Sequence, residues 1–255
     1  MQKVKKIVLT LFITILSSCV SKKAIVYFQN DQVEQAKVSN SYKTVFKPDD
    51  LLQITVSALD IEAVKPFNLP AVTYSTTTNS VIGTPQQQAY LIDNKGYIDF
   101  PLLGRLKIAG LTRSETIKLL KNKLDPDYIK NPTINIIISN FKITVLGDVK
   151  TPGSYKIPNE RITVLDAIGL AGDLNISGIR NIEVKREEGK KITTYKLDLR
   201  SNKLFTSPVY YLQQNDIVYV QPNKAKSQSA SYNQNTGLFI SIGSILISLI
   251  TILTR

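Results

Sequence analysis

Two apolar segments, one at each end of the chain, restrict the possible structure and class of this protein more than any motif between them does. A basic Met1–Lys6 leads into the apolar run Ile7–Leu16, and Leu238–Thr254 is apolar apart from small or hydroxylated residues. The long stretch between these ends is polar enough to fold as a soluble body. A body with membrane-seeking segments at both termini excludes most cytoplasmic enzymes.

The N-terminus has the parts of an export signal: lysines, a short apolar core and then small residues. The core is too short to cross a bilayer comfortably. Leu16-Ser17-Ser18-Cys19 resembles the lipobox of bacterial lipoproteins, in which the cysteine is acylated after cleavage. We therefore expect a signal peptide over 1–18 and membrane lipid attached to Cys19. The alternative is an ordinary cleaved signal with an incidental cysteine.

The residues after Cys19 bear on the destination. Val20-Ser21 follows the cysteine, so the aspartate that would suggest retention at the inner membrane is missing, and we expect an outer-membrane address with the body in the periplasm. Cys19 is the one cysteine of the chain, which excludes a disulfide within it. Buried acyl chains anchor durably because each methylene contributes about 0.8 kcal/mol.

The charge of the body is positive. Cleavage after residue 18 removes three lysines and no acids, which lowers the formal charge of +12 to +9. An exported lipoprotein meets no nucleic acid, so this charge suits an acidic polymer or anionic lipid head groups. The alternative is a solvated basic surface without a partner, because the lysines are scattered along the chain.

The composition argues against an enzyme. Histidine and tryptophan are absent, and Cys19 is assigned to the anchor. The commonest general base, the commonest metal ligand and the thiol nucleophile are therefore missing. We find no Ser-x-x-Lys signature beyond chance and no acid within an apolar run, and we expect no catalytic residue, metal or cofactor.

The body reads as two mixed units. In the first, a turn at Lys47–Asp50 precedes a strand over 51–56, and residues 61–90 lack periodicity and suggest a long loop. A β-hairpin turn is expected at Asp93–Gly96, a strand over 102–108, and a helix with capping-box spacing from Thr112. A helix stop at Asp125-Pro126 and a strand over 134–138 follow.

The second unit starts at Phe141. A strand over 143–149 leads to Pro152-Gly153, which predicts a type II turn. A helix begins at Thr163 and ends near Gly172, and a hairpin turns at Glu188-Gly189. The turn and strand at Asp50–Val56 resemble those at Asp216–Val220, although an aspartate turn before a strand also recurs by chance.

These residues resemble the polysaccharide-export family of bacterial outer-membrane lipoproteins. Tyr42–Ser139 resembles its polysaccharide-export domain, most closely over Asp93–Thr112, and Phe141–Pro222 resembles its soluble-ligand-binding β-grasp domain. The chain departs from the family in having Lys47-Pro48-Asp49 where a glycine is usual. It also carries one β-grasp repeat where longer members have two, so we expect a shorter periplasmic part.

The resemblance implies an α+β fold: two small mixed α/β domains, the second β-grasp-like, followed by a C-terminal transmembrane helix. It also implies a ring of identical subunits, often eight, that conducts capsular polysaccharide or exopolysaccharide without cleaving it, and an inner-membrane polysaccharide co-polymerase as partner. The expected boundaries are 1–18 signal peptide, 19–41 lipid-anchored tether, 42–140 polysaccharide-export domain, 141–222 β-grasp domain, 223–236 linker and 237–255 transmembrane helix. The motif positions expected to shape turns are Asp50, Gly96, Pro101, Gly104, Gly147, Pro152 and Gly153.

The C-terminal segment carries a stripe of small residues. Leu238–Thr254 corresponds to about 26 Å of helix, enough for a thin outer membrane with flanking help. Gly237, Ser241, Ser244, Ser248, Thr251 and Arg255 recur every three or four residues and fall on one helical face. This face can pack against neighbouring helices. The other interpretation, favoured by the implied ring, is that Ser241, Ser244, Ser248 and Thr251 line a lumen that binds sugars weakly.

Three functions remain open at this point. The first is a homo-oligomeric outer-membrane channel for polysaccharide. The second is a glycan-binding or scaffold lipoprotein of the export machinery that is not itself the pore, with the C-terminal helix as a plain anchor. The third places the helix in the cytoplasmic membrane and leaves Cys19 without lipid.

Overall fold

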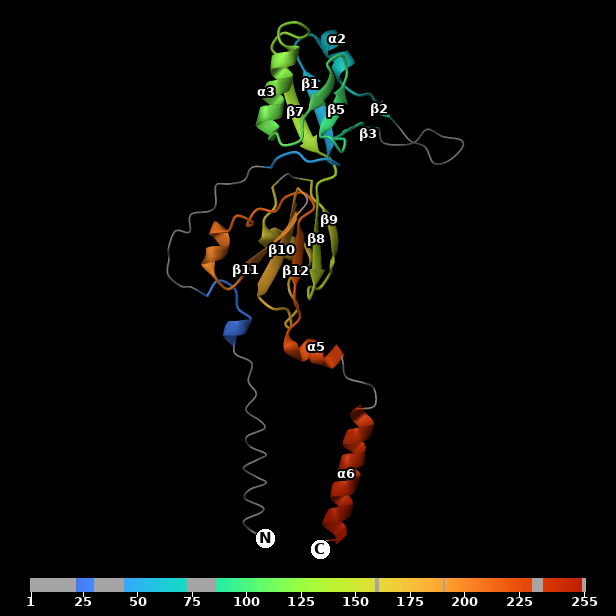
Figure 1. Cartoon of the computed structure of the whole chain (residues 1–255), viewed down its shortest axis with the longest axis vertical. Coiled ribbons are helices and arrows are strands. Elements are labelled where there is room, and N and C mark those ends of the chain that lie inside the picture. The colour runs from blue at the N-terminus through green and yellow to red at the C-terminus, as the bar shows by residue number, and fades with distance from the viewer. Residues whose placement is uncertain are drawn as a thin grey trace, which may run out of the picture.

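The computed structural model describes residues 22–29, 44–72, 86–158, 161–189, 191–230 and 236–253. Two sheet-containing units, 44–139 and 141–222, lie one above the other in Figure 1, and the helix over residues 236–253 lies toward its lower end. Five α-helices and four sheets among the described residues confirm the mixed α/β character expected from the sequence.

The first unit is built around an antiparallel sheet in the order β4-β1-β7. Alternate residues of β1 are buried, which is the half-buried pattern predicted for this strand. Helix α3 packs on the sheet with Thr116, Leu120 and Leu124 buried. The elements of this unit are β1 (Leu51–Ser57), α2 (Ile61–Val64), η2 (Lys65–Phe67), β2 (Ala71–Val72), β3 (Gln86–Gln87), β4 (Tyr90–Leu91), β5 (Tyr97–Phe100), β6 (Gly104–Lys107), α3 (Arg113–Leu124) and β7 (Thr133–Ile138).

The helix start predicted at Thr112 is confirmed. The Thr112 hydroxyl accepts from the backbone N–H of Glu115, and the Glu115 carboxylate accepts from the backbone N–H of Thr112 at 2.7 Å. This reciprocal capping satisfies two of the N–H groups that a helix start leaves open. Asp125 ends the helix, as predicted.

Two predictions for the first unit are wrong in part. Asp93–Gly96 does form a tight turn, but β4 pairs with β1 and β5 pairs with β6, so the hairpin lies one turn later. The stretch predicted as a long loop from residue 61 begins with α2, because the Asp60 carboxylate caps the N–H groups of Glu62 and Ala63. A helix of one turn is too short to show periodicity. Residues 73–85 lie outside the described part.

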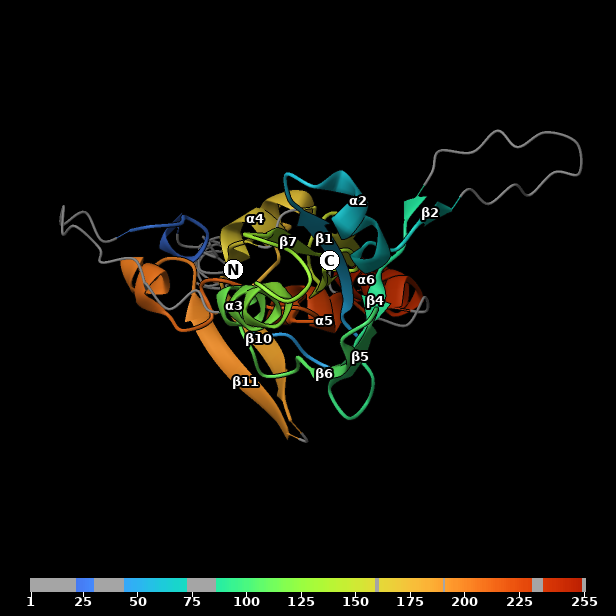
Figure 2. The same cartoon turned by 90° about the horizontal axis from the view of Figure 1, so that it is seen from above.

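The second unit is a mixed five-stranded sheet in the order β11-β10-β12-β8-β9, with β12 and β8 parallel at its centre. Helix α4 covers one face, as the view from above shows (Figure 2), and its Val164, Ala167 and Ile168 are buried. The resemblance implied a β-grasp-like unit at this place. Its elements are β8 (Lys142–Gly147), β9 (Gly153–Lys156), α4 (Val164–Leu170), β10 (Asn181–Glu188), β11 (Lys191–Asp198), η3 (Asn202–Thr206) and β12 (Ile217–Val220).

In the second unit, the predicted helix ends and hairpin turn are confirmed, and one predicted turn is wrong. Thr163 and Asp166 form a capping box, Gly172 follows α4 with a φ of +74°, and the hairpin turns at Gly189 with a φ of +65°. These features agree with the predictions. The type II turn at Pro152-Gly153 is wrong, because Gly153 lacks the positive φ that such a turn requires and instead begins β9.

The C-terminal segment is helical. Helix α5 spans Lys224–Ala230 and α6 spans Thr236–Leu253. Among the residues that the structure describes, no helix combines the length and apolar character needed to cross a membrane. The transmembrane helix expected over 237–255 is therefore not supported, and residues 254–255 lie outside the described part.

The segment expected to be a free tether is ordered in part. The 3-10 turn η1 (Lys22–Ala24) precedes Ile25–Gln29, and the N–H groups of Phe28 and Gln29 donate to the carbonyls of Leu199 and Arg200 at 3.3 and 2.8 Å. Part of the predicted tether thus docks on the second unit. Cys19 and residues 1–18, predicted to be a signal peptide, lie outside the described residues.

Candidate functional site

Two turns of the same construction meet at the junction of the units. In one, the Asp50 carboxylate accepts from the backbone N–H of Lys47 at 2.8 Å; in the other, Asp216 accepts from Gln213 at 2.8 Å. The residues just before these aspartates, Asp49 and Asn215, have φ values of +70° and +65°. The echo noted in the sequence is thus a repeated local structure that starts β1 and β12.

The two buried aspartates differ in their partners. Asp216 is 1% exposed and forms a two-pronged ion pair with the Arg186 guanidinium, with N–O distances of 3.0 and 2.6 Å. Asp50 is also 1% exposed, but among the described residues it accepts from backbone and faces no comparable cation. Burial raises the pKa of Asp50 to about 6, and the hydrogen bond from Lys47 only partly offsets this.

The raised pKa of Asp50 predicts a pH-dependent stability. The folded state holds the proton of Asp50 more tightly than the unfolded state does. The contribution of this proton to the free energy of unfolding is therefore full below about pH 4 and is lost as the pH rises through about 6. We expect the free energy of unfolding to fall by up to about 3 kcal/mol across this window. Asp50→Asn, which keeps the acceptor for Lys47, should flatten that part of the profile in urea unfolding measured from pH 4 to 7.

Asp99→Asn is the matched control, because Asp99 is exposed in the same unit. Its profile should follow that of the unmodified protein. An unchanged slope in Asp50→Asn would contradict the assignment of the titration to Asp50.

The junction is clamped by amide side chains. Asn140, between β7 and β8, accepts from the N–H of Leu51 and donates to the carbonyl of Asp49, both at 2.9 Å. Gln214 donates to the Asn140 carbonyl at 3.0 Å and accepts from the N–H of Lys142 at 2.8 Å. Each turn is therefore tied to the same short connection.

One lysine bridges the two turns directly. The Lys47 ammonium of the first turn donates to the Gln213 side chain of the second turn at 3.3 Å and to the Glu187 carbonyl at 3.4 Å. Together with Asn140 and Gln214, this contact holds the two units in one relative orientation. The sequence placed Lys47 in a turn, but sequence reasoning did not identify Asn140 or Gln214.

The motif residues of the first unit shape backbone. Gly96 has a φ of +87°, and a Cβ there would lie 2.6 Å from that of Ala109. Pro101 and Gly104 flank the turn of the β5–β6 hairpin, and Gly104 has a φ of +69°. Arg105 pairs with Asp93 and lies over the Tyr97 ring at 4.7 Å, so this block is held together by its own side chains.

Gly147 is the tightest motif position of the second unit. Its φ is +94°, and a Cβ would lie 1.9 Å from the Val220 carbonyl oxygen of β12. Pro152 and Gly153 precede and begin β9. The next residue, Asp148, is buried and pairs with Lys226 of α5, and it also accepts from Asn175 at 2.8 Å. The end of β8 thus contacts two elements: Gly147 lies close to β12, and Asp148 pairs with α5.

The docked segment Ile25–Gln29 binds through three side chains of the second unit. The buried Arg180 guanidinium donates to the Ile25 carbonyl at 3.0 Å, the Tyr27 hydroxyl donates to Asp173 at 2.6 Å, and Phe28 stacks on Phe205. Burial, followed by the bond to Asp173, raises the pKa of Tyr27 above its usual range, so the hydroxyl keeps its proton. Sequence reasoning missed this contact because the segment has no periodic pattern.

Removing the Tyr27 hydroxyl should loosen this segment. We expect Tyr27→Phe to weaken docking by about 1 kcal/mol, because a hydrogen bond to a carboxylate is lost. Hydrogen exchange at the amides of Phe28 and Gln29 should then speed up about fivefold. Mass spectrometry of the exchanged protein measures this. Tyr97→Phe, in the other unit, should leave these amides unchanged, and equal rates in all three proteins would contradict the docking.

The serine stripe of α6 is engaged within its own helix. The Ser241, Ser244 and Ser248 hydroxyls donate to the carbonyls of Gly237, Ser241 and Ser244 at 2.8, 2.8 and 3.0 Å. Each hydroxyl proton is therefore used by the backbone, and the oxygens remain as acceptors. The side chain of Thr251 lies outside the described part.

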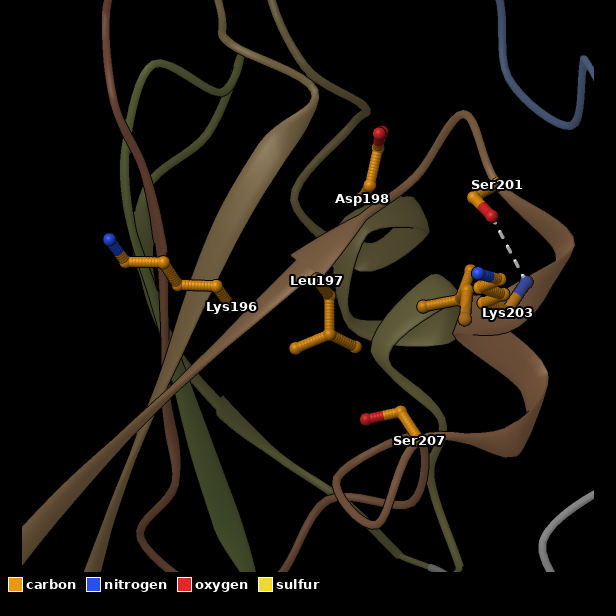
Figure 3. A pocket seen from close by; sticks show the side chains of 7 residues that line it. Lys196, Leu197, Asp198, Ser201, Lys203 and Ser207 are labelled. Carbon is orange, nitrogen blue, oxygen red and sulfur yellow. Dashed lines mark hydrogen bonds between the residues drawn. The ribbon is translucent and has the colours of Figure 1, made fainter.

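A polar pocket of about 280 Å³ lies beside η3. Figure 3 shows Ser201 accepting from the backbone N–H of Lys203, while the Lys196 side chain points away from both. Asp198 at its edge is occupied by Arg200 at 2.8 Å. The pocket therefore offers no paired acid and base, and the described residues contain no cluster of three or more acidic, histidine or cysteine side chains suited to a metal.

Taken together, the described part defines an α+β protein of two mixed units clamped at their junction. Residues 38–139 match the family described as polysaccharide biosynthesis/export protein, and residues 141–220 match the SLBB domain. The chain belongs to the polysaccharide-export family. This is a family of export proteins and not of enzymes.

Two relatives bear this out. The chain is 25% identical over 177 residues to the EPS I polysaccharide export outer membrane protein EpsA of Ralstonia solanacearum, covering 65% of this chain and 47% of the relative. It is 25% identical over 174 residues to EpsA of Ralstonia nicotianae, covering 64% and 45%. The chain thus spans about half the length of the curated relatives it matches. Both are outer-membrane proteins by name, in agreement with the outer-membrane address expected from the sequence.

Proposed function

We propose that this protein is a lipid-anchored subunit of an outer-membrane assembly that exports capsular polysaccharide or exopolysaccharide. The observation that carries the proposal is the consecutive match of both units, residues 38–139 and 141–220, to domains of export proteins. The names of both relatives support the same substrate class. Cys19 carries the lipid, and the described body lies in the periplasm.

Identical copies form a ring around the path of the polysaccharide. The clamped junction supports this arrangement, because a subunit that bends between its units would not hold a passage of constant width. Asn140, Gln214 and Lys47 supply that rigidity. An inner-membrane polysaccharide co-polymerase delivers the chain to the ring.

Electron microscopy of the detergent-extracted full chain tests the ring. We expect closed rings of identical subunits with a central opening. Monomers and dimers without an opening would contradict the ring and leave a glycan-binding or scaffold lipoprotein, in which the path is formed by another protein.

The serine-bearing face of α6 is turned toward the path in the same proposal. The oxygens of Ser241, Ser244 and Ser248 accept hydrogen bonds from sugar hydroxyls weakly, as conduction requires. Ser244→Trp should reduce surface polysaccharide, measured on cells, while ring assembly is preserved. Ile247→Trp, on a neighbouring face, is the control. Normal export by Ser244→Trp in assembled rings would contradict this placement.

A further inference from the structure

Among the described residues, the face of the five-stranded sheet opposite α4 carries only half-buried and exposed side chains. Residues that point toward α4, among them Ile143, Val145 and Val184, are buried. Their strand neighbours point the other way, and every such position in the described strands of this sheet is half-buried or exposed. We call the part of this surface on β8, β9 and β12 the open face; these strands are labelled in the lower sheet of Figure 1.

Two lysines on this open face stand directly opposite each other. Lys142 of β8 is in register with Lys156 of β9, and both side chains are exposed. Like charges at opposed positions destabilise a strand pair. Among the described residues, neither ammonium group has an acidic partner. The opposed lysines therefore do not stabilise the β8–β9 pair, and their positive charge can meet an external anion.

The neighbouring positions suit a sugar chain. The hydroxyls of Thr144 and Ser154 lie 2.9 Å apart in the next row of the same face. Beyond them, Leu146 is 42% exposed and lies in register with the half-buried Tyr219 of β12, whose ring has the Lys185 ammonium 5.9 Å from its centre. Hydroxyls can exchange hydrogen bonds with sugar hydroxyls, and an aromatic ring beside an aliphatic side chain can pack against the C–H face of a sugar ring.

The remaining charge of the sheet is nearly balanced. Strands β10 and β11 together carry four acidic and four basic residues, and Glu183 lies 4.0 Å from Lys185 and opposite Lys196 in the register. The unbalanced positive charge is therefore concentrated on Lys142 and Lys156.

We propose that the open face binds an acidic polysaccharide, with carboxylates of the sugar chain at Lys142 and Lys156 and sugar rings over Leu146 and Tyr219. This inference rests on the proposed function and narrows its substrate to anionic glycans. Exposed ion pairs are individually weak and exchange rapidly, which suits a surface that a moving polymer slides along.

Binding of two labelled oligosaccharides to the detergent-solubilised full chain tests the proposal. Fluorescence anisotropy should detect oligogalacturonate, a chain of uronates, and should detect uncharged dextran of similar length at least about tenfold more weakly. Lys142→Gln/Lys156→Gln should weaken oligogalacturonate binding about tenfold and should leave thermal stability unchanged or higher, because it removes a like-charge contact.

Lys118→Gln/Lys121→Gln on the exposed side of α3 is the matched control, since it removes the same charge from the other unit. It should bind oligogalacturonate as the unmodified protein does. If both double variants lose the same amount of oligogalacturonate binding, the loss comes from net charge alone, and the proposed site is wrong. Equal binding of dextran and oligogalacturonate would also overturn it. A change in oligomer size in the Lys142/Lys156 variant would assign the face to contact between subunits instead.

Experiments in cells can distinguish an error in the acidic-glycan inference from an error in the proposed function. If deletion of the gene leaves polysaccharide export intact, the proposed function is wrong. If deletion abolishes export and Lys142→Gln/Lys156→Gln restores it fully while binding both glycans equally, only the acidic-glycan inference is wrong.

Discussion

Gly147→Ala is expected to lower the free energy of unfolding by about 2–5 kcal/mol. Alanine disfavours the φ of +94° by about 1–2 kcal/mol. In addition, its Cβ would lie 1.9 Å from the Val220 carbonyl oxygen, and relieving such a contact costs about 1–3 kcal/mol more. The obstacle is backbone and not a flexible side chain, so the central β8–β12 pair must separate.

Urea unfolding followed by circular dichroism measures this loss. Gly189→Ala is the matched control, because Gly189 lies in the same unit with a φ of +65° and nothing within 4 Å of the added Cβ. It should lose only about 1 kcal/mol. Similar losses in both variants would mean that φ alone matters and that the close approach of Gly147 to β12 is not a constraint.

Arg186→Met is expected to destabilise the second unit by about 3–5 kcal/mol. The guanidinium and Asp216 are 6% and 1% exposed, so removal of the cation leaves a buried carboxylate without its charge partner. Asp216 also closes the turn that meets Lys47 and starts β12, so the loss should extend to the junction.

Arg200→Met tests whether burial is the cause. Arg200 pairs with Asp198 at 2.8 Å, but these side chains are 35% and 37% exposed. Water replaces the lost partner there, and the expected cost is below about 1 kcal/mol. Adding Asp216→Asn to Arg186→Met should recover part of the stability, because the uncompensated charge is removed. No recovery would contradict the account of a buried charge.

Features coded by adjacent residues could be predicted from the sequence. The capping boxes at Thr112 and Thr163 need only residues three positions apart, and the alternation of β1 follows from its own seven residues. Strand partners could not be predicted in this way. A turn at Asp93–Gly96 predicts a hairpin, but β4 finds its partner in β1, some forty residues earlier in the chain.

The contacts that connect distant segments were also missed. Asn140 and Gln214 form the clamp with polar side chains that carry no periodic signal, and the docking of Ile25–Gln29 depends on Arg180 and Asp173. The glycines at 96 and 147 were identified as turn positions, whereas the close approaches that exclude a Cβ depend on Ala109 and Val220. The serine stripe of α6 was recognised, but the use of its hydroxyl protons by the helix was not.

We propose that this protein takes part in the export of polysaccharide across the outer membrane. The most direct test is to measure polysaccharide outside the cell and in the periplasm of a strain that lacks the gene, with and without the full chain restored. We expect surface polysaccharide to be lost on deletion, to accumulate in the periplasm and to return with the restored chain. Undiminished surface polysaccharide in the deletion strain would contradict the account.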